Sequence, residues 1–272
     1  MKTILVPIDF SEDSENAAHY AAELAKFSGS KIVLLHIYSL PVPIVENPVS
    51  DVQYEEIGTL NKELLKSLEA KLRSVHGNIE IEAISTVGFT IEEIRYYSET
   101  KKADIVVMGI SEAGKSVSSF GNITTSTIKE SACPVLIIPG NARFKKPSRI
   151  ALACDYSSIL PDEIIEKFKA IVKLFNAKVL VFDVLKTTEL VNFEKAMAEH
   201  SLEESFQDIN HSVYFPSGDD LVKETNSFIN KHMVDMLVMI PHKYSFFSGM
   251  FHRSNTKQMA LNTHVPLLTI HE

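Results

Sequence analysis

The chain carries one pattern of segments twice, in the same order, across nearly all of its 272 residues. Four stretches of the first copy each have a counterpart in the second: Val6–Ser11 (VPIDFS) and Leu152–Ser157 (LACDYS), Thr86–Gly88 (TVG) and Phe215–Gly218 (FPSG), Ala103–Met108 (ADIVVM) and Val234–Met239 (VDMLVM), and Cys133–Leu136 (CPVL) and Val265–Leu268 (VPLL). Matches that keep their order over such a length are typical of an internal repeat. The length also suits two domains of ordinary size. We therefore predict domains at residues 1–140 and 149–272, joined by the polar and basic segment 141–148.

Strand patterns alternate with helix patterns within each copy. The first copy is predicted to form strands at Lys2–Ile8, Ile32–Ile37, Ile79–Ser85, Ile105–Met108 and Val135–Ile138, with helices at Ser11–Ala25, Val52–Val75, Ile91–Ser98 and Thr124–Glu130. The second is predicted to form strands at Ile150–Ala153, Val179–Phe182, His211–Phe215, Met236–Ile240 and Leu267–Ile270, with helices at Glu163–Phe175, Leu190–Phe206, Leu221–Lys231 and Asn255–Leu261. Strands that alternate with helices form a parallel sheet through right-handed crossovers. The predicted fold class is α/β, with two tandem five-stranded parallel sheets.

Composition and charge indicate the cellular compartment and exclude some classes of partner. The formal net charge of −8 argues against a nucleic-acid surface, because phosphate binding requires clustered Lys and Arg. The longest apolar runs, such as Val179–Phe182 and Met236–Ile240, are too short to cross a bilayer. We therefore expect a cytoplasmic protein with no nucleic-acid or membrane partner. In that compartment, Cys133 and Cys154 are expected to be buried reduced thiols rather than a disulfide.

Asp9 is the first candidate for a ligand-binding residue. Ligands of open parallel sheets bind at the carboxyl ends of the strands, where the strand order reverses. Asp9 directly follows the first predicted strand and precedes the helix start at Ser11. An aspartate at this place also commonly caps a helix or forms a turn. Asp155 holds the same place in the second copy, which a repeated cap explains equally well, so both interpretations stay open.

The stretch Gly109–Asn122, after the fourth predicted strand, is the second candidate. Gly109 allows the backbone to approach an anion closely, and a helix opened by Gly121 and Asn122 offers free N–H groups to a phosphate. Further donors lie along the stretch and just beyond it: Lys115, Ser116, Ser118, Ser119, Asn122 and Thr124. The alternative interpretation is a flexible, serine-rich surface loop.

The same stretch contains a literal Gly-x-x-x-x-Gly-Lys-Ser, at Gly109–Ser116. As a P-loop it would make the chain a Mg²⁺-dependent nucleotide hydrolase, and a strand precedes it as that motif requires. However, this strand is the fourth of its unit, and Gly121 interrupts the helix that should begin at Lys115. The second copy also has no equivalent. The P-loop interpretation therefore ranks last.

Several short stretches resemble the universal stress protein family: Val6–Ser11 (VPIDFS), Leu34–Ile37 (LLHI), Val106–Gly109 (VVMG) and Cys133–Pro139 (CPVLIIP). The likeness covers residues 1–140 and, more weakly, 149–272, so the chain resembles a tandem universal stress protein. The family implies five-stranded parallel α/β sandwiches of the adenine nucleotide alpha hydrolase-like type, frequent binding of ATP or AMP, and pairing of two such units through their last strands. For this chain it implies intramolecular pairing of the two domains, with a homodimer as the alternative, and an unidentified protein partner.

By position, the resemblance implies a set of nucleotide-binding residues: Pro7, Asp9 and Ile37 around the base and ribose, Met108 and Gly109 at the start of the loop, Lys115 within it, and Gly121, Asn122 and Ile123 at the phosphates. The family's binding members carry Gly-x-x-Gly, nine residues, then Gly-Ser or Gly-Thr. Here Glu112 replaces the second glycine, the spacing from Gly109 to Gly121 is one residue short, and Asn122 replaces the hydroxyl residue. A carboxylate at Glu112 repels phosphates unless it turns outward or holds Mg²⁺.

The second copy departs further from the family. Pro241–Tyr244 replaces the glycine opening, and proline offers no backbone N–H. Large apolar side chains then fill the loop, where they would block a phosphate or form an interface: Phe246, Phe247, Met250 and Phe251. His242 and His252 are expected to be surface residues, or residues with satisfied hydrogen bonds, rather than metal ligands. The ligand site of this copy is therefore predicted to be degenerate.

The leading hypothesis is a stress-response protein that binds ATP or AMP in its first domain in a regulatory role. The alternative is an interaction module that binds no nucleotide and acts through the degenerate second domain. Local spacing implies no nucleophile elbow and no Ser/His/Asp or Cys/His set, so no catalytic residue is predicted. Slow ATP hydrolysis stays compatible with the sequence. His36, within a buried strand pattern, is expected to be a core histidine with satisfied hydrogen bonds.

Overall fold

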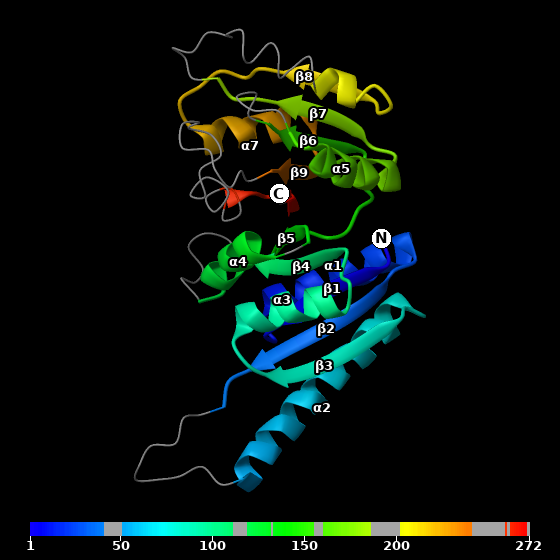
Figure 1. Ribbon diagram of the computed structural model, residues 1–272, viewed down its shortest axis with the longest axis vertical. Helices are drawn as coiled ribbons and strands as arrows, with labels where there is room; N and C mark the ends of the chain where they lie inside the picture. The colour runs from blue at the N-terminus through cyan, green and yellow to red at the C-terminus, as the bar shows by residue number, and fades with distance from the viewer. Residues whose placement is uncertain are drawn as a thin grey trace. The chain divides into compact units, whose positions relative to one another are not determined.

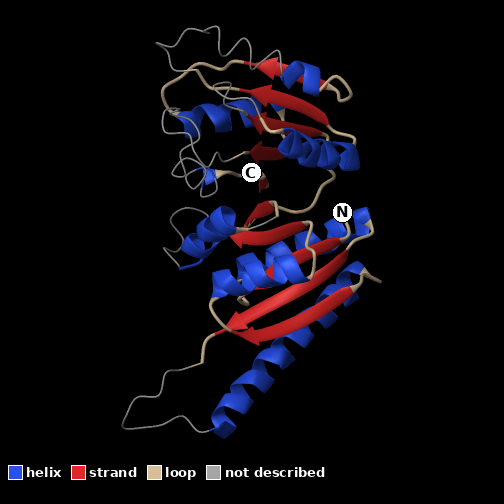
Figure 2. Ribbon diagram, viewed as in Figure 1, coloured by secondary structure: helices blue, strands red, loops and turns tan. Residues whose placement is uncertain are grey.

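The computed structural model describes residues 1–40, 51–110, 119–131, 133–154, 160–185, 202–240, 259 and 262–270. The described chain divides into two compact units, and the first gives way to the second between Phe144 and Lys145. The boundary lies inside the polar segment 141–148. Each unit is a sheet with helices packed against it (Figures 1 and 2).

The first unit is built around a sheet of parallel strands. Its strands are β1 (Thr3–Ile8), β2 (Lys31–Tyr38), β3 (Ile81–Val87), β4 (Ile105–Ile110) and β5 (Val135–Pro139), and its helices are α1 (Glu12–Ser28), α2 (Asp51–His76), α3 (Thr90–Thr100) and α4 (Ser119–Glu130). The strand order is β3-β2-β1-β4-β5, and each neighbouring pair runs parallel. The fold class predicted from the alternation of strands and helices is confirmed, and every strand predicted for this copy forms.

The second unit repeats this arrangement. Its elements are β6 (Arg149–Ala153), α5 (Asp162–Phe175), β7 (Lys178–Phe182), β8 (His211–Tyr214), α7 (Leu221–His232), β9 (Met236–Met239) and β10 (Leu267–Thr269). Its strand order, β10-β9-β6-β7-β8, is that of the first unit, with β6 in the place of β1. Most of the predicted helices Leu190–Phe206 and Asn255–Leu261 lies outside the described residues.

Helices cover both faces of the first sheet, with α3 and α4 in contact on one face and α1 and α2 in contact on the other (Figure 1). β1 and β4 are buried along their whole length, so the core lies at the centre of the sheet. α1 packs on this core through small side chains that are at most 1% exposed: Ala17, Ala18, Ala21, Ala22 and Ala25. Ser11 caps α1 as predicted, because its Oγ accepts a hydrogen bond from the amide of Ser14 at 3.2 Å. Gly29, with φ 70°, ends the helix.

An aspartate ahead of β4 fixes the start of β1. Oδ2 of Asp104 accepts hydrogen bonds from the backbone amides of Lys2 at 2.6 Å and Thr3 at 2.9 Å. These amides are more than 100 residues from Asp104 in the chain, at separations of 102 and 101. The carboxylate therefore joins the entrance of β1 to that of its neighbour β4.

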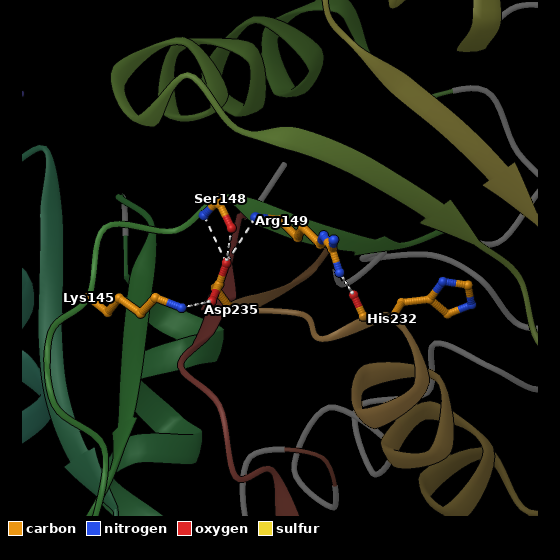
Figure 3. Close-up of polar contacts among 5 residues, drawn as sticks. All are labelled: Lys145, Ser148, Arg149, His232 and Asp235. Carbon is orange, nitrogen blue, oxygen red and sulfur yellow. Dashed lines mark hydrogen bonds and ion pairs between the residues drawn. The ribbon is translucent and has the colours of Figure 1, made fainter.

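Asp235 makes the same contact in the second unit. Its Oδ2 accepts hydrogen bonds from the backbone amides of Ser148 at 2.8 Å and Arg149 at 3.0 Å, at the start of β6 (Figure 3). The Ser148 hydroxyl and Lys145 Nζ also donate to this carboxylate, at 2.7 Å and 3.1 Å. Asp104 and Asp235 hold matching places in the sequence repeat, so the contact belongs to the repeated unit rather than to one copy.

Two local predictions are wrong. α4 begins at Ser119 rather than at Thr124, so Gly121 and Asn122 lie inside the helix. Glycine and asparagine have low helix propensity, and tertiary packing overrides that preference here. Cys154 is buried as expected, whereas Cys133 is only half-buried. Among the described residues, every helix is too short or too polar to cross a membrane.

Candidate functional site

β1 and β4, which are neighbours in the first sheet, separate at their carboxyl ends. The last residues paired between them are Leu5 and Val106, although β1 continues to Ile8 and β4 continues to Ile110. The strand order also reverses here, because the chain runs outward from β1 to β2 and β3 and then crosses to β4. In this class of fold, ligands bind at such a switch point, at the carboxyl edge of the sheet.

The β1 side of this edge carries two of the predicted residues. Pro7 is buried in the part of β1 that no longer pairs with β4, where a residue without an N–H disrupts no ladder to β4. Asp9 is exposed just beyond the strand. Its Oδ1 accepts hydrogen bonds from the amide of Ser11 at 3.0 Å and from the Ser11 hydroxyl at 2.6 Å. Asp9 is thus a turn residue ahead of α1, and this network leaves its second oxygen, Oδ2, at the carboxyl edge.

An aromatic cluster lies beside Asp9. Phe10 has φ 61°, an unusual conformation for a bulky residue, and its ring lies 4.5 Å from that of His36 on β2. His36 donates from Nδ1 to the carbonyl of Ile8 at 2.7 Å, and its Nε2 lies 3.2 Å from Oδ1 of Asn61 on α2. The ring of Tyr38 stacks on that of His36, with centroids 6.0 Å apart. The prediction of a satisfied core histidine is confirmed.

Sequence reasoning missed the partners of His36. Phe10 and Tyr38 adjoin the predicted strands, but no pattern in the sequence says that their rings contact one imidazole. Asn61 is 25 residues beyond His36, in a helix whose polar positions all look alike in the sequence. Together these contacts tie α2 and the end of β2 to the turn that contains Asp9.

The β4 side is shaped by close packing with α1. A Cβ added to Gly109 would lie 2.1 Å from the backbone oxygen of Asp13, and one added to Gly140 would lie 2.5 Å from Oδ1 of the same residue. Both glycines therefore let the first turn of α1 approach the edge, a packing role that the sequence prediction did not include. Met108 is 0% exposed and belongs to the core. Ile37, near the end of β2, is half-buried and pairs with Thr86.

The remaining predicted residues lie on or before α4. Gly121, Asn122 and Ile123 fall in the first part of this helix, directly after the segment that follows β4. Lys115 lies outside the described residues. On the core side of α4, the hydroxyls of Thr124 and Thr127 are buried and have no hydrogen-bond partner in the described part of the chain. The N-terminal turn of a helix favours anionic groups, and an exposed carboxylate such as that of Asp9 accepts hydrogen bonds from hydroxyl groups.

The second unit carries different chemistry at the corresponding edge. The register of the strands puts Cys154 and Asp183 in the places of Ile8 and His36. Both are buried, with exposed fractions of 5% and 2%. A buried carboxylate thus replaces an imidazole. Two further sets of residues singled out for this copy, Asp155 and those in the loop that follows β9, lie outside the described residues. Among the described residues of the whole chain, no group of three or more His, Cys, Asp or Glu side chains could hold a metal ion.

These features define a doubly wound parallel α/β protein, built from two like units, whose ligand edge differs between the units. The model of the universal stress protein family matches residues 1–139. The chain belongs to that family. The resemblance seen in the short motifs is therefore confirmed across the first unit.

Curated relatives and solved structures agree with this placement. A universal stress protein of Methanocaldococcus jannaschii is 28% identical over 151 residues, covering 54% of this chain and 84% of that protein. One from Thermus aquaticus is 29% identical over 138 residues, covering 50% of this chain and 98% of that protein. A universal stress protein structure from Archaeoglobus fulgidus has a TM-score of 0.75 at 21% identity, covering 99% of this chain and 98% of the other. That structure shows the same fold for both units.

Proposed function

We propose that the first unit binds an adenine nucleotide, ATP or AMP, at the carboxyl edge between β1 and β4. The observation that carries the proposal is the separation of these strands beyond Leu5 and Val106, where the exposed Asp9 lies at the β1 side. Family membership supports the nucleotide as ligand, and the switch point supports its place. We further propose that occupancy regulates a stress response in the cytoplasm, with the second unit as a structural partner.

Each part of the edge suits one part of a nucleotide. Oδ2 of Asp9 is an acceptor for ribose hydroxyls, since a carboxylate accepts but does not donate. Pro7 and Ile37 offer apolar surface to the base. The first-turn amides of α4, including those of Gly121 and Asn122, favour phosphate oxygens. Lys115 would add positive charge, and a Mg²⁺ ion would offset the carboxylate of Glu112.

The regulatory step follows from the position of the phosphates. A nucleotide that contacts both the β1 turn and the start of α4 favours one arrangement of the segment between β4 and α4. A partner protein that recognises this arrangement would then respond to nucleotide occupancy, because a ligand shifts a conformational equilibrium by its differential affinity. No side chain in this scheme acts as a nucleophile or general base.

A second candidate function is an interaction module that binds no nucleotide. It is favoured by the second unit, where buried Asp183 replaces His36. The imidazole that contacts the Asp9 turn in the first unit is thus absent here, so the carboxyl edge of the second unit is built differently from the one proposed to bind nucleotide.

The test begins with protein purified without added nucleotide, examined by mass spectrometry and ³¹P NMR, followed by calorimetry with ATP and AMP with and without Mg²⁺. Asp9→Asn keeps an acceptor oxygen for Ser11 but removes the charge, and we expect it to weaken binding about tenfold, or about 1.4 kcal/mol. Asp220→Asn is the matched control, because Asp220 caps α7 in the second unit through the amide of Lys223 at 3.1 Å.

Three outcomes separate the hypotheses. Copurified nucleotide whose affinity falls in Asp9→Asn but not in Asp220→Asn supports the proposed site. No copurified nucleotide and no heat of binding, with or without Mg²⁺, leaves the interaction module. Rapid ATP turnover that disappears in Lys115→Ala would instead support the P-loop hydrolase.

A further inference from the structure

The contact between α1 and α2 contains a line of three titratable side chains. His76, the last residue of α2, directs Nδ1 to Oε1 of Glu23 on α1 at 2.6 Å. Its Nε2 lies 2.8 Å from Nδ1 of His19, which is also on α1. The two imidazole rings have centroids 5.1 Å apart, and His76 is 8% exposed. The line has no part in the carboxyl-edge site described above.

The number of protons on the two rings decides whether this line can form. An ionised glutamate only accepts, so Nδ1 of His76 carries a proton. A single proton between Nε2 of His76 and Nδ1 of His19 then forms the hydrogen bond between the rings. This holds when both rings are neutral and also when one of the two rings is protonated. When both rings are protonated, both facing nitrogens carry a proton. The hydrogen bond is then lost, and two positive charges face each other.

We propose that Glu23, His76 and His19 form an acid-sensitive clasp between α1 and α2. The clasp is closed while the two imidazoles share a proton, and it opens when both rings are protonated. Its geometry makes the second protonation the switching event. The two helices are otherwise joined at the surface by Lys71 and Glu15, whose ion pair of 2.7 Å does not depend on histidine.

The surroundings of His19 disfavour its protonation. Burial is the largest cause of a lowered pKa for His19. The positive charges of protonated His76, Lys71 and Arg143 lower it further, and Glu15 opposes them. A lowered pKa means that the fold favours neutral His19. The contribution of the clasp to stability is therefore full above pH 6.5, the ordinary value, and falls as the pH drops from there through the lowered pKa.

Opening the clasp would loosen both helices that border the carboxyl edge. The first turn of α1 packs against Gly109 and is capped by Ser11 beside Asp9. α2 supplies Asn61, which contacts His36. An acid-dependent fall in nucleotide affinity follows from these contacts. This consequence rests on the proposed function, whereas the clasp itself rests on the histidine geometry alone.

NMR titration of the histidine rings in the full-length protein tests the clasp directly. We expect His19 to titrate below 6.5, the ordinary histidine pKa, and its pKa to rise toward that value in His76→Gln, because a positive neighbour is removed. Long-range ¹⁵N–¹H spectra should show the Nδ1–H form of His76. A His19 midpoint at or above 6.5, or one that His76→Gln leaves unchanged, would overturn the proposal.

Hydrogen exchange of wild type, His19→Gln and the control His264→Gln supplies the second readout. When the pH is lowered from 7.5 to 5.5, the amides of α1 and α2 should lose protection from exchange in wild type and in the control, after exchange rates are corrected for the intrinsic effect of pH. Because the ordinary pKa is 6.5, lowering the pKa of His19 can raise the population of the opened state by at most about tenfold at pH 5.5. Glutamine can bond to His76 but does not titrate, so His19→Gln should abolish the loss; an equal loss in this variant refutes the clasp.

ATP calorimetry at the same two pH values separates this proposal from the proposed function. Affinity that falls at pH 5.5 in wild type but not in His19→Gln supports both. Absence of ATP binding at both pH values refutes the proposed function, while the titration and exchange results still decide the clasp. If His19→Gln fails to fold, the wild-type ring titration remains decisive.

Discussion

Replacing Asp235 by alanine tests whether one carboxylate fixes the start of β6. Oδ2 accepts two backbone amide bonds, from Ser148 at 2.8 Å and Arg149 at 3.0 Å, and the Ser148 hydroxyl bond at 2.7 Å. Oδ1 accepts from Lys145 Nζ at 3.1 Å. The Asp235 side chain is 14% exposed and that of Lys145 is 78% exposed. The Asp235 carboxylate is therefore mostly buried, whereas the lysine that pairs with it is exposed to solvent.

The expected loss follows from these bonds. A hydrogen bond to a charged group contributes about 1.5–3 kcal/mol, but losses within one network do not add. We expect Asp235→Ala to lower the free energy of unfolding of the second unit by about 2–4 kcal/mol, because two backbone donors lose their acceptor. Lys145→Ala should cost at most about 1 kcal/mol, as for other exposed ion pairs. Asp235→Asn keeps an acceptor oxygen for the amides and should fall between the two.

Urea denaturation of the full chain gives the change in stability, and hydrogen exchange resolved by peptide assigns it to a unit. Asp104→Ala is the matched control in the first unit, since its Oδ2 accepts the amides of Lys2 and Thr3 in the same way. Asp104→Ala should lower the protection of β1 and β4 from hydrogen exchange while the protection of β6 is unchanged. A loss in Asp235→Ala within about 0.5 kcal/mol of that in Lys145→Ala would refute the reasoning.

Three further predictions concern packing, a buried hydroxyl and acid. Gly109→Ala should lower stability by about 1–3 kcal/mol or more, because its Cβ would lie 2.1 Å from the backbone oxygen of Asp13. Thermal melting measures the loss, with Gly77→Ala as the control. Gly77 has φ 83°, and a Cβ added there would meet no atom within 4 Å, so the control reports backbone strain without a clash. Thr127→Val should leave stability unchanged or raise it by up to about 1 kcal/mol, since the buried Thr127 hydroxyl has no partner in the described part of the chain; a loss above about 1 kcal/mol in urea melts would contradict this. Burial alone would raise the pKa of Asp235, but hydrogen bonds from Ser148, Arg149 and Lys145 together hold it below its ordinary value. The stability that Asp235 contributes should thus be present above pH 3.8 and disappear as the pH falls through the lowered pKa, an effect absent from acid titrations of Asp235→Ala.

Local patterns in the sequence predicted the elements well where hydrophobic spacing and capping agree. Ser11 caps α1, and the runs of apolar residues became the central strands. The prediction failed at the start of α4, because the preferences of Gly121 and Asn122 oppose a helix that packing imposes. Asp9 illustrates a harder case: the sequence left open whether it forms a cap or turn or contacts a ligand, and the structure shows the turn, in which Oδ1 accepts two hydrogen bonds from Ser11.

By itself, the sequence determined that this protein is one α/β unit used twice, because strand and helix periods and turn residues act over a few positions along the chain. Only the tertiary structure decided the order of the strands, the separation of β1 and β4, and the line from Glu23 through His76 to His19. These features depend on which side chains from distant segments fill the same space. His19 and His76 are 57 residues apart, and nothing in their local patterns indicates that their rings meet.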